Sequence, residues 1–251
     1  MKFQMFIGFD SREISAYQVC VHSLRERASC ALVVEPVLEP HLRALGMYRR
    51  RHELRNGRLW DTLSAAPMST EFALTRFLTP ALSRADWAVF CDCDFLWRTD
   101  VAELLSLADP RYAVMVVQHA YAPVAGIKMD NQIQLAYPRK NWSSLVLWNC
   151  RHPAHSVLPE LVNTWAGRRL HGFEWLADGL IGSLPEAWNW LEGHSSPALE
   201  AKAVHFTRGT PDLPGYREVA YADEWQRVRA QLEANDVFAR SGDGEARVAL
   251  S

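Results

Sequence analysis

The amino-acid sequence predicts an α/β fold with a mostly parallel central sheet and helices on both faces. The apolar run 3–9, an amphipathic segment and the β-branched run 31–38 follow one another, and strand–helix–strand is the order that opens a doubly wound fold. A further apolar run, 87–91, suits a buried strand and ends abruptly in Asp92 and Asp94. Open α/β sheets bind ligands at the carboxyl ends of their strands, so we expect the functional site at this acidic turn.

The composition is that of a soluble globular protein. A chain of 251 residues, 49% of them hydrophobic, is long enough for one large α/β domain. The formal net charge of -2 argues against a bulk nucleic-acid binder. Five scattered cysteines do not form a disulfide framework, and the charged N-terminus does not fit a signal peptide, so we expect a cytoplasmic protein. No apolar run reaches transmembrane length, although the sequence leaves peripheral membrane contact open.

The first half of the chain is expected to alternate strands and helices. The helix after the first strand can be capped by Asp10 or Ser11, and Asp100 can cap a second, short helix. The arginine-rich segment 41–66 lacks a clean period and predicts a loop or an irregular helix. The expected strands span residues 3–9, 31–38 and 87–91, and residues 69–82 are expected to be helical.

The second half contains shorter elements separated by turn-forming residues. The polar and aromatic stretch 118–142 is interrupted by Pro123, Gly126 and Pro138, which break any long element. Without internal repeats or a linker, the sequence predicts one domain over residues 1–240 and a mobile tail over 241–251. The expected strands span residues 112–117, 143–148 and 203–206, and the expected helices span 159–165, 173–180 and 223–234.

The two aspartates after the central strand indicate a cation site. Two carboxylates held this close repel each other, and burying either one unpaired is costly. A divalent cation bound through oxygen removes that cost, and Mg²⁺ in proteins typically uses one or two carboxylates together with substrate phosphates. The alternative is a surface turn in which Asp92 and Asp94 are both solvated.

Three other groups accompany this motif. Gly8 and Asp10 end the first strand, where the chain can approach a ligand or simply cap a helix. Arg76 precedes the central strand and can orient a carboxylate, contact a phosphate or lie in solvent. His205 stands on a short strand before Gly209, so it can complete a cation site or belong to the core.

Taken in chain order, these groups resemble the family 8 glycosyltransferases, which include glycogenin and bacterial lipopolysaccharide galactosyl- and glucosyltransferases. The resemblance extends to about Tyr216 and implies a GT-A fold, a UDP-sugar donor and a Mn²⁺ ion, with Mg²⁺ as the alternative. It is carried by Ile7-Gly8-Phe9-Asp10, Arg76, Asp92-Cys93-Asp94, Trp142-Ser143-Ser144, Asp178 and His205-Phe206-Thr207-Arg208-Gly209.

The resemblance also implies roles for individual residues. Asp92, Asp94 and His205 would be the metal ligands. Asp178 and Arg76 would take part in catalysis, with Asp178 either a nucleophile or an electrostatic partner of the sugar. The residues implied to bind the nucleotide-sugar are Gly8, Asp10, Arg76, Cys93, Ser143, Ser144, Lys202 and Gly209.

The chain departs from the family pattern where the family contacts the sugar and the phosphates. Trp142-Ser143-Ser144-Leu145 stands in place of Asn-x-Gly, and Asp178-Gly179 stands in place of Asp-Gln. Thr210-Pro211-Asp212 replaces Lys-Pro-Trp. The identity of the sugar therefore does not follow from the resemblance.

The sequence therefore predicts a retaining, metal-dependent glycosyltransferase acting on a glycan, lipid-linked or small-molecule acceptor. One alternative is a haloacid-dehalogenase-like phosphatase, in which Asp92 would be a covalent nucleophile. That family normally carries its motif near the N-terminus with Thr or Val two residues after the second aspartate, where this chain has Leu96. A sugar-phosphate nucleotidyltransferase would need a glycine-rich N-terminal loop, which the sequence lacks. The remaining alternative is an inactive module that binds UDP without turnover.

Overall fold

The computed structural model describes residues 3–119, 139 and 141–234, and its centre is a six-stranded sheet with the order β10-β8-β9-β6-β1-β2. Only β9 runs antiparallel to its neighbours, so the predicted α/β fold with a mostly parallel sheet is confirmed. The predicted tail 241–251 and the stretch 120–138 lie outside the described residues. The strands are β1 (Phe3–Gly8), β2 (Val34–Val37), β6 (Trp87–Cys91), β8 (Val114–Val117), β9 (Leu145–Asn149) and β10 (Ile181–Leu184).

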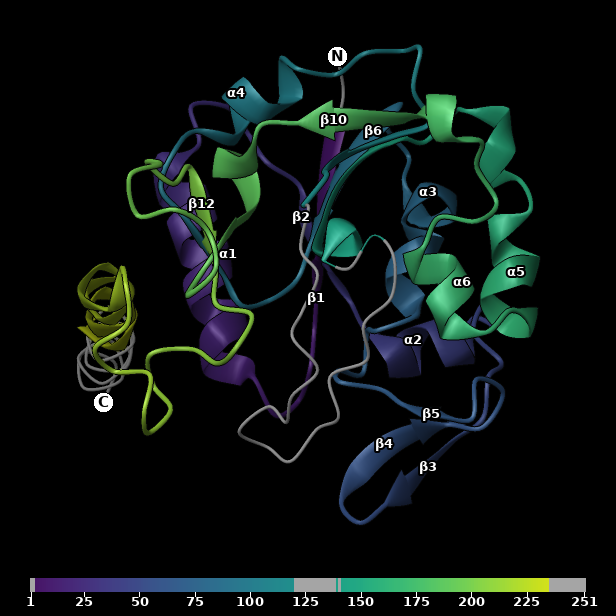
Figure 1. Cartoon of the computed structure of the whole chain (residues 1–251), viewed down its shortest axis with the longest axis horizontal. Coiled ribbons are helices and arrows are strands. Elements are labelled where there is room, and N and C mark those ends of the chain that lie inside the picture. The colour runs from purple at the N-terminus through teal and green to yellow at the C-terminus, as the bar shows by residue number, and fades with distance from the viewer. Residues whose placement is uncertain (1–2, 120–138, 140, 235–251) are drawn as a thin grey trace, which may run out of the picture.

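The helices cover both faces of this sheet. Figure 1 shows α1 on one side and α3, α5 and α6 on the other. All five residues of β6 are buried, as expected for an apolar strand enclosed by neighbours and helices. At the edge, β2 exposes Glu35 and Pro36, and proline blocks further pairing there. The helices are α1 (Ile14–Arg27), α2 (Glu39–Ala44), α3 (Thr79–Leu82), α4 (Val101–Leu105), α5 (Leu158–Thr164) and α6 (Gly167–His171).

A second, three-stranded sheet lies next to the acidic turn and has the order β11-β12-β7. β7 (Phe95–Trp97) begins directly after Asp94, and β12 (Ala203–His205) pairs with it in antiparallel register. His205 stands opposite Phe95, and their rings stack at 4.6 Å between centroids. β11 (Trp190–Leu191) completes this sheet, which joins the C-terminal part of the chain to the motif.

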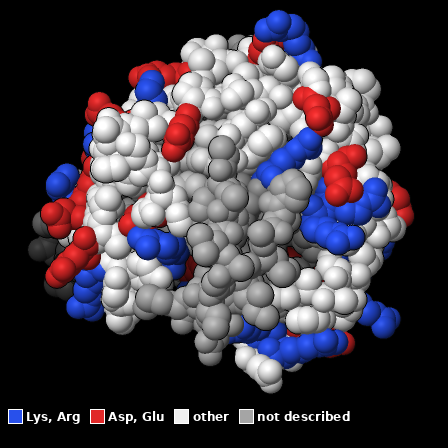
Figure 2. Space-filling view, viewed as in Figure 1, with Lys and Arg blue, Asp and Glu red and all other residues white. Residues whose placement is uncertain are grey.

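The prediction of a loop or irregular helix over 41–66 is wrong. After α2 the segment forms a three-stranded antiparallel sheet of β3 (His52–Arg55), β4 (Arg58–Asp61) and β5 (Ala66–Pro67). Asn56 and Gly57 adopt positive φ values of 52° and 75°, which tight two-residue hairpin turns require. They connect β3 to β4. In Figure 2, arginine side chains gather at the lower edge of the view, over this hairpin.

Other boundaries also differ from the prediction. Residues 69–82 contain a short 3₁₀ helix, Thr75–Leu78, followed by α3, rather than one helix. The helix predicted at 173–180 is absent, because Phe173 has a φ of 54° and only the 3₁₀ turn Asp178–Leu180 precedes the unpredicted β10. The helix predicted at 223–234 is confirmed and covers 222–234, where the described residues end. None of the described helices is long and apolar enough to cross a lipid bilayer.

We predict that Gly8→Ala lowers the free energy of unfolding by about 1–3 kcal/mol, the usual cost of overpacking a core. A Cβ at Gly8 would overlap the ring of the buried Phe72. Gly179→Ala is the matched control, because a Cβ at Gly179 would meet no atom within 4 Å. Urea denaturation of both variants measures the difference, and equal stability would contradict the packing role of Gly8.

Candidate metal centre

The acidic turn between β6 and β7 is held by backbone hydrogen bonds from two directions. The amide of Asp92 donates to the carbonyl oxygen of Ser144 at 2.9 Å, at the start of β9. The amide of Phe206 donates to the carbonyl oxygen of Asp94 at 3.0 Å, just after β12. Both aspartates are therefore fixed in place by the two sheets that meet here.

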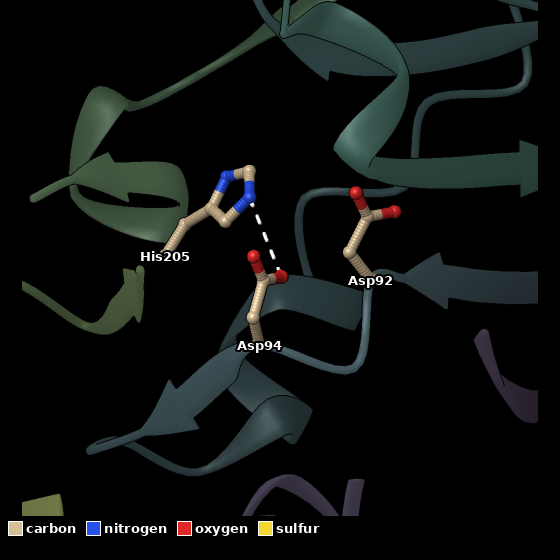
Figure 3. A group of neighbouring side chains, drawn as sticks. All are labelled: Asp92, Asp94 and His205. Carbon is tan, nitrogen blue, oxygen red and sulfur yellow. Dashed lines mark ion pairs between the residues drawn. The ribbon is translucent and has the colours of Figure 1, made fainter. Parts of the chain in front are cut away.

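Asp92, Asp94 and His205 converge at this turn. Their potential ligand atoms all lie within 4.8 Å of one another (Figure 3). His205 is buried, and its Nε2 lies 3.4 Å from Oδ1 of Asp94. The structure thus brings together the three residues that the sequence predicted as metal ligands.

The donor set suits a divalent cation. Oδ1 of Asp94 is a buried oxygen without a hydrogen-bond partner among the described residues, since Nε2 of His205 lies 3.4 Å away, farther than in an ordinary hydrogen bond. Such an unsatisfied buried oxygen indicates that a partner is missing. Two carboxylates and one imidazole are compatible with Mn²⁺, because imidazole favours transition metals over hard cations.

Arg76 compensates part of the negative charge. Its Nη1 donates to Oδ1 of Asp92 at 2.6 Å and to the carbonyl oxygen of Ser143 at 3.0 Å. The guanidinium lies over the rings of Phe72 and Phe90 at 5.1 and 5.2 Å, and its side chain is only 6% exposed. Arg76 therefore lies beside the acidic turn, as predicted, rather than in solvent.

The carboxyl groups of the centre have pKa values that depart from their ordinary ones. Burial raises the pKa of Asp92 to about 6, although Arg76 opposes this shift. Burial and the nearby Asp94 raise the pKa of Glu13 to about 7. Burial also acts to raise the pKa of Asp94, but His205, the backbone of Asp94 and Arg76 together outweigh it, and the pKa lies below its ordinary value. Crowded carboxyl groups of this kind are stabilised by a cation.

The metal centre lines a cavity of about 610 Å³, a size typical of small-molecule sites. Arg12, Arg76 and Arg208 contribute the positive charge of its lining. Arg208 forms a bidentate contact with the largely buried Glu192, with distances of 2.7–3.0 Å. Fixed guanidinium groups of this kind are suited to phosphate oxygens.

Gly8 and Asp10 shape the cavity from behind. Gly8 allows Phe72, a lining residue, to pack against β1. The fully buried Asp10 accepts hydrogen bonds from the amide and guanidinium of Arg12 and from the amide of Glu71. Because these contacts occupy both carboxylate oxygens, the observed role of Asp10 is to fix Arg12 beside the cavity.

Three of the other predicted binding residues line the cavity directly. Ser143, Ser144 and Gly209 belong to its wall, and the Ser143 hydroxyl lies 2.7 Å from Nδ1 of His171. Gly209 has a φ of 150°, and a Cβ there would lie 2.7 Å from the ring of Tyr216. Cys93, the middle residue of the turn, is fully buried and does not line the cavity.

The structure does not bring Lys202 and Asp178 to this cavity. Lys202 forms an ion pair with Glu103 at 2.5 Å, and neither belongs to the cavity lining. Asp178 is 90% exposed and pairs with Arg139 at 2.5 Å. Both side chains therefore form ion pairs outside the cavity lining that the described residues provide.

Several cavity and support residues were missed from the sequence. Glu13 accepts a hydrogen bond from the Cys93 thiol at 3.0 Å, and no motif in the sequence marks it. Arg208 directly precedes Gly209, a predicted binding residue, and this position in the motif could have identified it as a cavity residue. His171 and Asn189 carry no local motif, so only the folded structure shows their proximity to the site.

Comparisons with known proteins define the class of this fold. The bifunctional glycosyltransferase WbbM is 15% identical, with a TM-score of 0.58 over 91% of this chain and 49% of its own, so the present chain spans about half its length. The galactosyltransferase LgtC, solved with donor and acceptor sugar analogs, is 12% identical, with a TM-score of 0.59 over 91% and 95%. The chain has a GT-A-like fold shared with these glycosyltransferases.

A curated relative defines the family. No protein-family model matches the chain. Protein CDI of Arabidopsis thaliana is 47% identical over 231 residues, which cover 89% of this chain and 84% of the relative. The chain belongs to the family of Protein CDI.

Proposed function

We propose that the protein is a metal-dependent glycosyltransferase that moves a sugar from a nucleotide-sugar, a UDP-sugar, to a glycan, lipid-linked or small-molecule acceptor. The observation that carries this proposal is the convergence of Asp92, Asp94 and His205 in a cavity of a GT-A-like fold. The unsatisfied buried oxygen of Asp94 supports a cation at this point.

Asp92, Asp94 and His205 would hold the cation, Mn²⁺ or alternatively Mg²⁺. When bound, such a cation neutralises the charge of a diphosphate leaving group. Arg76 keeps Asp92 oriented through its 2.6 Å contact, so the carboxylate reaches the cavity in one conformation. Ser143 and Ser144 belong to the cavity wall and would shape the sugar site, because their hydroxyl groups are held by His171 and by Asn141 and Asn189.

Arg12 and Arg208 would contact the diphosphate oxygens. Each guanidinium is held by a buried carboxylate, Asp10 or Glu192, so little side-chain entropy is lost when an anion binds. Preorganised positive groups stabilise the negative charge that develops on a leaving group. This proposal assigns no phosphate contact to Lys202, which pairs with Glu103 outside the cavity lining.

Membership of glycosyltransferase family 8 and retention of configuration belong to the same proposal. Their support is the order of motifs in the chain together with the fold. Asp178 is given no chemical step, because its exposed carboxylate pairs with Arg139. A cytoplasmic location is proposed from the five cysteines, all of which have free thiols.

We predict that UDP binding requires a divalent cation and that Mn²⁺ supports it at least as well as Mg²⁺. The imidazole of His205 is the ligand that favours a transition metal. Calorimetric titration of UDP with either cation, and with a chelator, measures the requirement. Undiminished UDP affinity in chelator would contradict the metal centre.

We predict that Asp92→Asn, Asp94→Asn and His205→Ala each reduce kcat/KM for a competent UDP-sugar by about 100-fold or more. Each change removes a ligand of the cation that neutralises the leaving group. Turnover is measured as UDP release, after a panel of UDP-sugars has been screened by thermal shift.

Matched controls are Asp86→Asn and His41→Ala, at exposed side chains outside the cavity lining. Both controls are expected to keep wild-type turnover. UDP binding without turnover of any UDP-sugar would support the alternative of an inactive binding module.

We predict an α-linked product from an α-linked UDP-sugar. Retention follows from the proposed family membership rather than from any single side chain. Proton NMR of the first product reads the configuration from its anomeric coupling. A β-linked product would overturn the retaining assignment while leaving the metal centre intact.

A further inference from the structure

Asn189 is a fully buried polar residue that lies behind the metal centre rather than in it. It ends the 3₁₀ helix Glu186–Asn189, immediately before β11. Its side chain has no exposed surface and does not line the cavity. Its Oδ1 nevertheless lies 3.0 Å from Nδ1 of His205.

The orientation of the Asn189 amide follows from its other contacts. Nδ2 lies 3.2 Å from the backbone carbonyl oxygen of Asn141, which can only accept a hydrogen bond. Nδ2 also lies 2.9 Å from the Ser144 hydroxyl, which donates its own proton to the same carbonyl at 2.7 Å. Both N–H bonds of Asn189 are therefore used, and Oδ1 must be the atom facing His205.

This orientation of the Asn189 amide determines that Nδ1 of His205 carries a proton. The amide Oδ1 has no hydrogen to give, so Nδ1 of His205 must donate. In a neutral imidazole the lone pair then belongs to Nε2. In that neutral form Nε2 would direct its lone pair at Oδ1 of Asp94, 3.4 Å away, so a divalent cation or a proton between the two atoms would satisfy both.

We propose that Asn189 is a positioning residue that fixes His205 in the Nδ1–H tautomer, which makes Nε2 available to a divalent cation shared with Asp94. The inference rests on the proposed metal-dependent function and deepens it. Stacking on Phe95 fixes the plane of the imidazole ring, and Asn189 selects which nitrogen carries the proton. In other metal sites, loss of such a supporting hydrogen bond weakens metal affinity by about 10–100-fold.

The first experiment needs no metal. Proton–nitrogen correlation spectra of metal-free protein at about pH 8, above the ordinary histidine pKa, report which ring nitrogen is protonated. Signals of His205 are assigned by their loss in His205→Gln. We expect a proton on Nδ1 of His205 in the wild type, whether or not Nε2 also carries one, and a ring protonated on Nε2 alone would overturn the proposal.

The second experiment measures Mn²⁺ affinity calorimetrically in three variants. Asn189→Leu removes the acceptor and is expected to bind Mn²⁺ about 10–100-fold more weakly than wild type. Asn189→Asp keeps an acceptor oxygen and is expected to recover the tautomer and most of the affinity. Asn163→Leu removes hydrogen bonds of an asparagine on α5 and serves as the control for general destabilisation.

The outcomes separate this inference from the proposed function. Wild-type affinity in Asn189→Leu, with circular dichroism confirming the fold, would overturn the role of Asn189 alone. A fall in affinity of the same size in Asn163→Leu would also overturn it. A wild-type protein that binds no Mn²⁺ would overturn the metal centre itself, and the proposed function with it.

Discussion

The partial burial of two carboxylates at the end of β6 is the constraint on which the rest of the structure depends. A strand with all residues buried leads directly into Asp92 and Asp94, so their charge must be compensated within the protein. Arg76 compensates Asp92 from the segment before the strand, and His205 approaches Asp94 from a strand far later in the chain. Arg76 and His205 together do not satisfy the acidic turn, since one oxygen of Asp94 has no hydrogen-bond partner among the described residues.

The small sheet β11-β12-β7 follows from this constraint. It continues the chain beyond the acidic turn and pairs β12 with β7, so the backbone of Phe206 binds the carbonyl of Asp94. The antiparallel strand β9 has a related effect on the other side, because Ser144, immediately before its first residue, accepts the amide of Asp92. A polar layer of Ser144 and Asn189 then connects the two sheets behind His205. The metal centre is thus built where two sheets meet, which favours a fixed geometry.

The sequence predicted those helices and strands whose hydrophobic pattern lies within the element itself. The fully apolar β6 and the amphipathic α1 were predicted because burial dictates their composition. The β3–β4 hairpin was missed because β3 is fully exposed and β4 only partly buried, so neither shows a buried apolar pattern, although Asn56-Gly57 is a hairpin signal. β10 was missed because a helix was expected across the residues before it, where the positive φ of Phe173 is set by tertiary packing rather than by propensity.

Ion pairing explains which positively and negatively charged residues line the cavity. The family resemblance suggested Lys202 and Asp178, but each is partnered elsewhere, by Glu103 and Arg139. Arg12 and Arg208 line the cavity because the buried Asp10 and Glu192 hold them at its edge. A buried carboxylate that fixes an arginine leaves other guanidinium N–H groups free to meet an anion, since the fork carries five donors. Ion pairing with carboxylates, which is settled only in the folded chain, therefore decides which arginine and lysine side chains reach the cavity. The residues predicted to bind the metal, by contrast, are identified by a motif in the sequence.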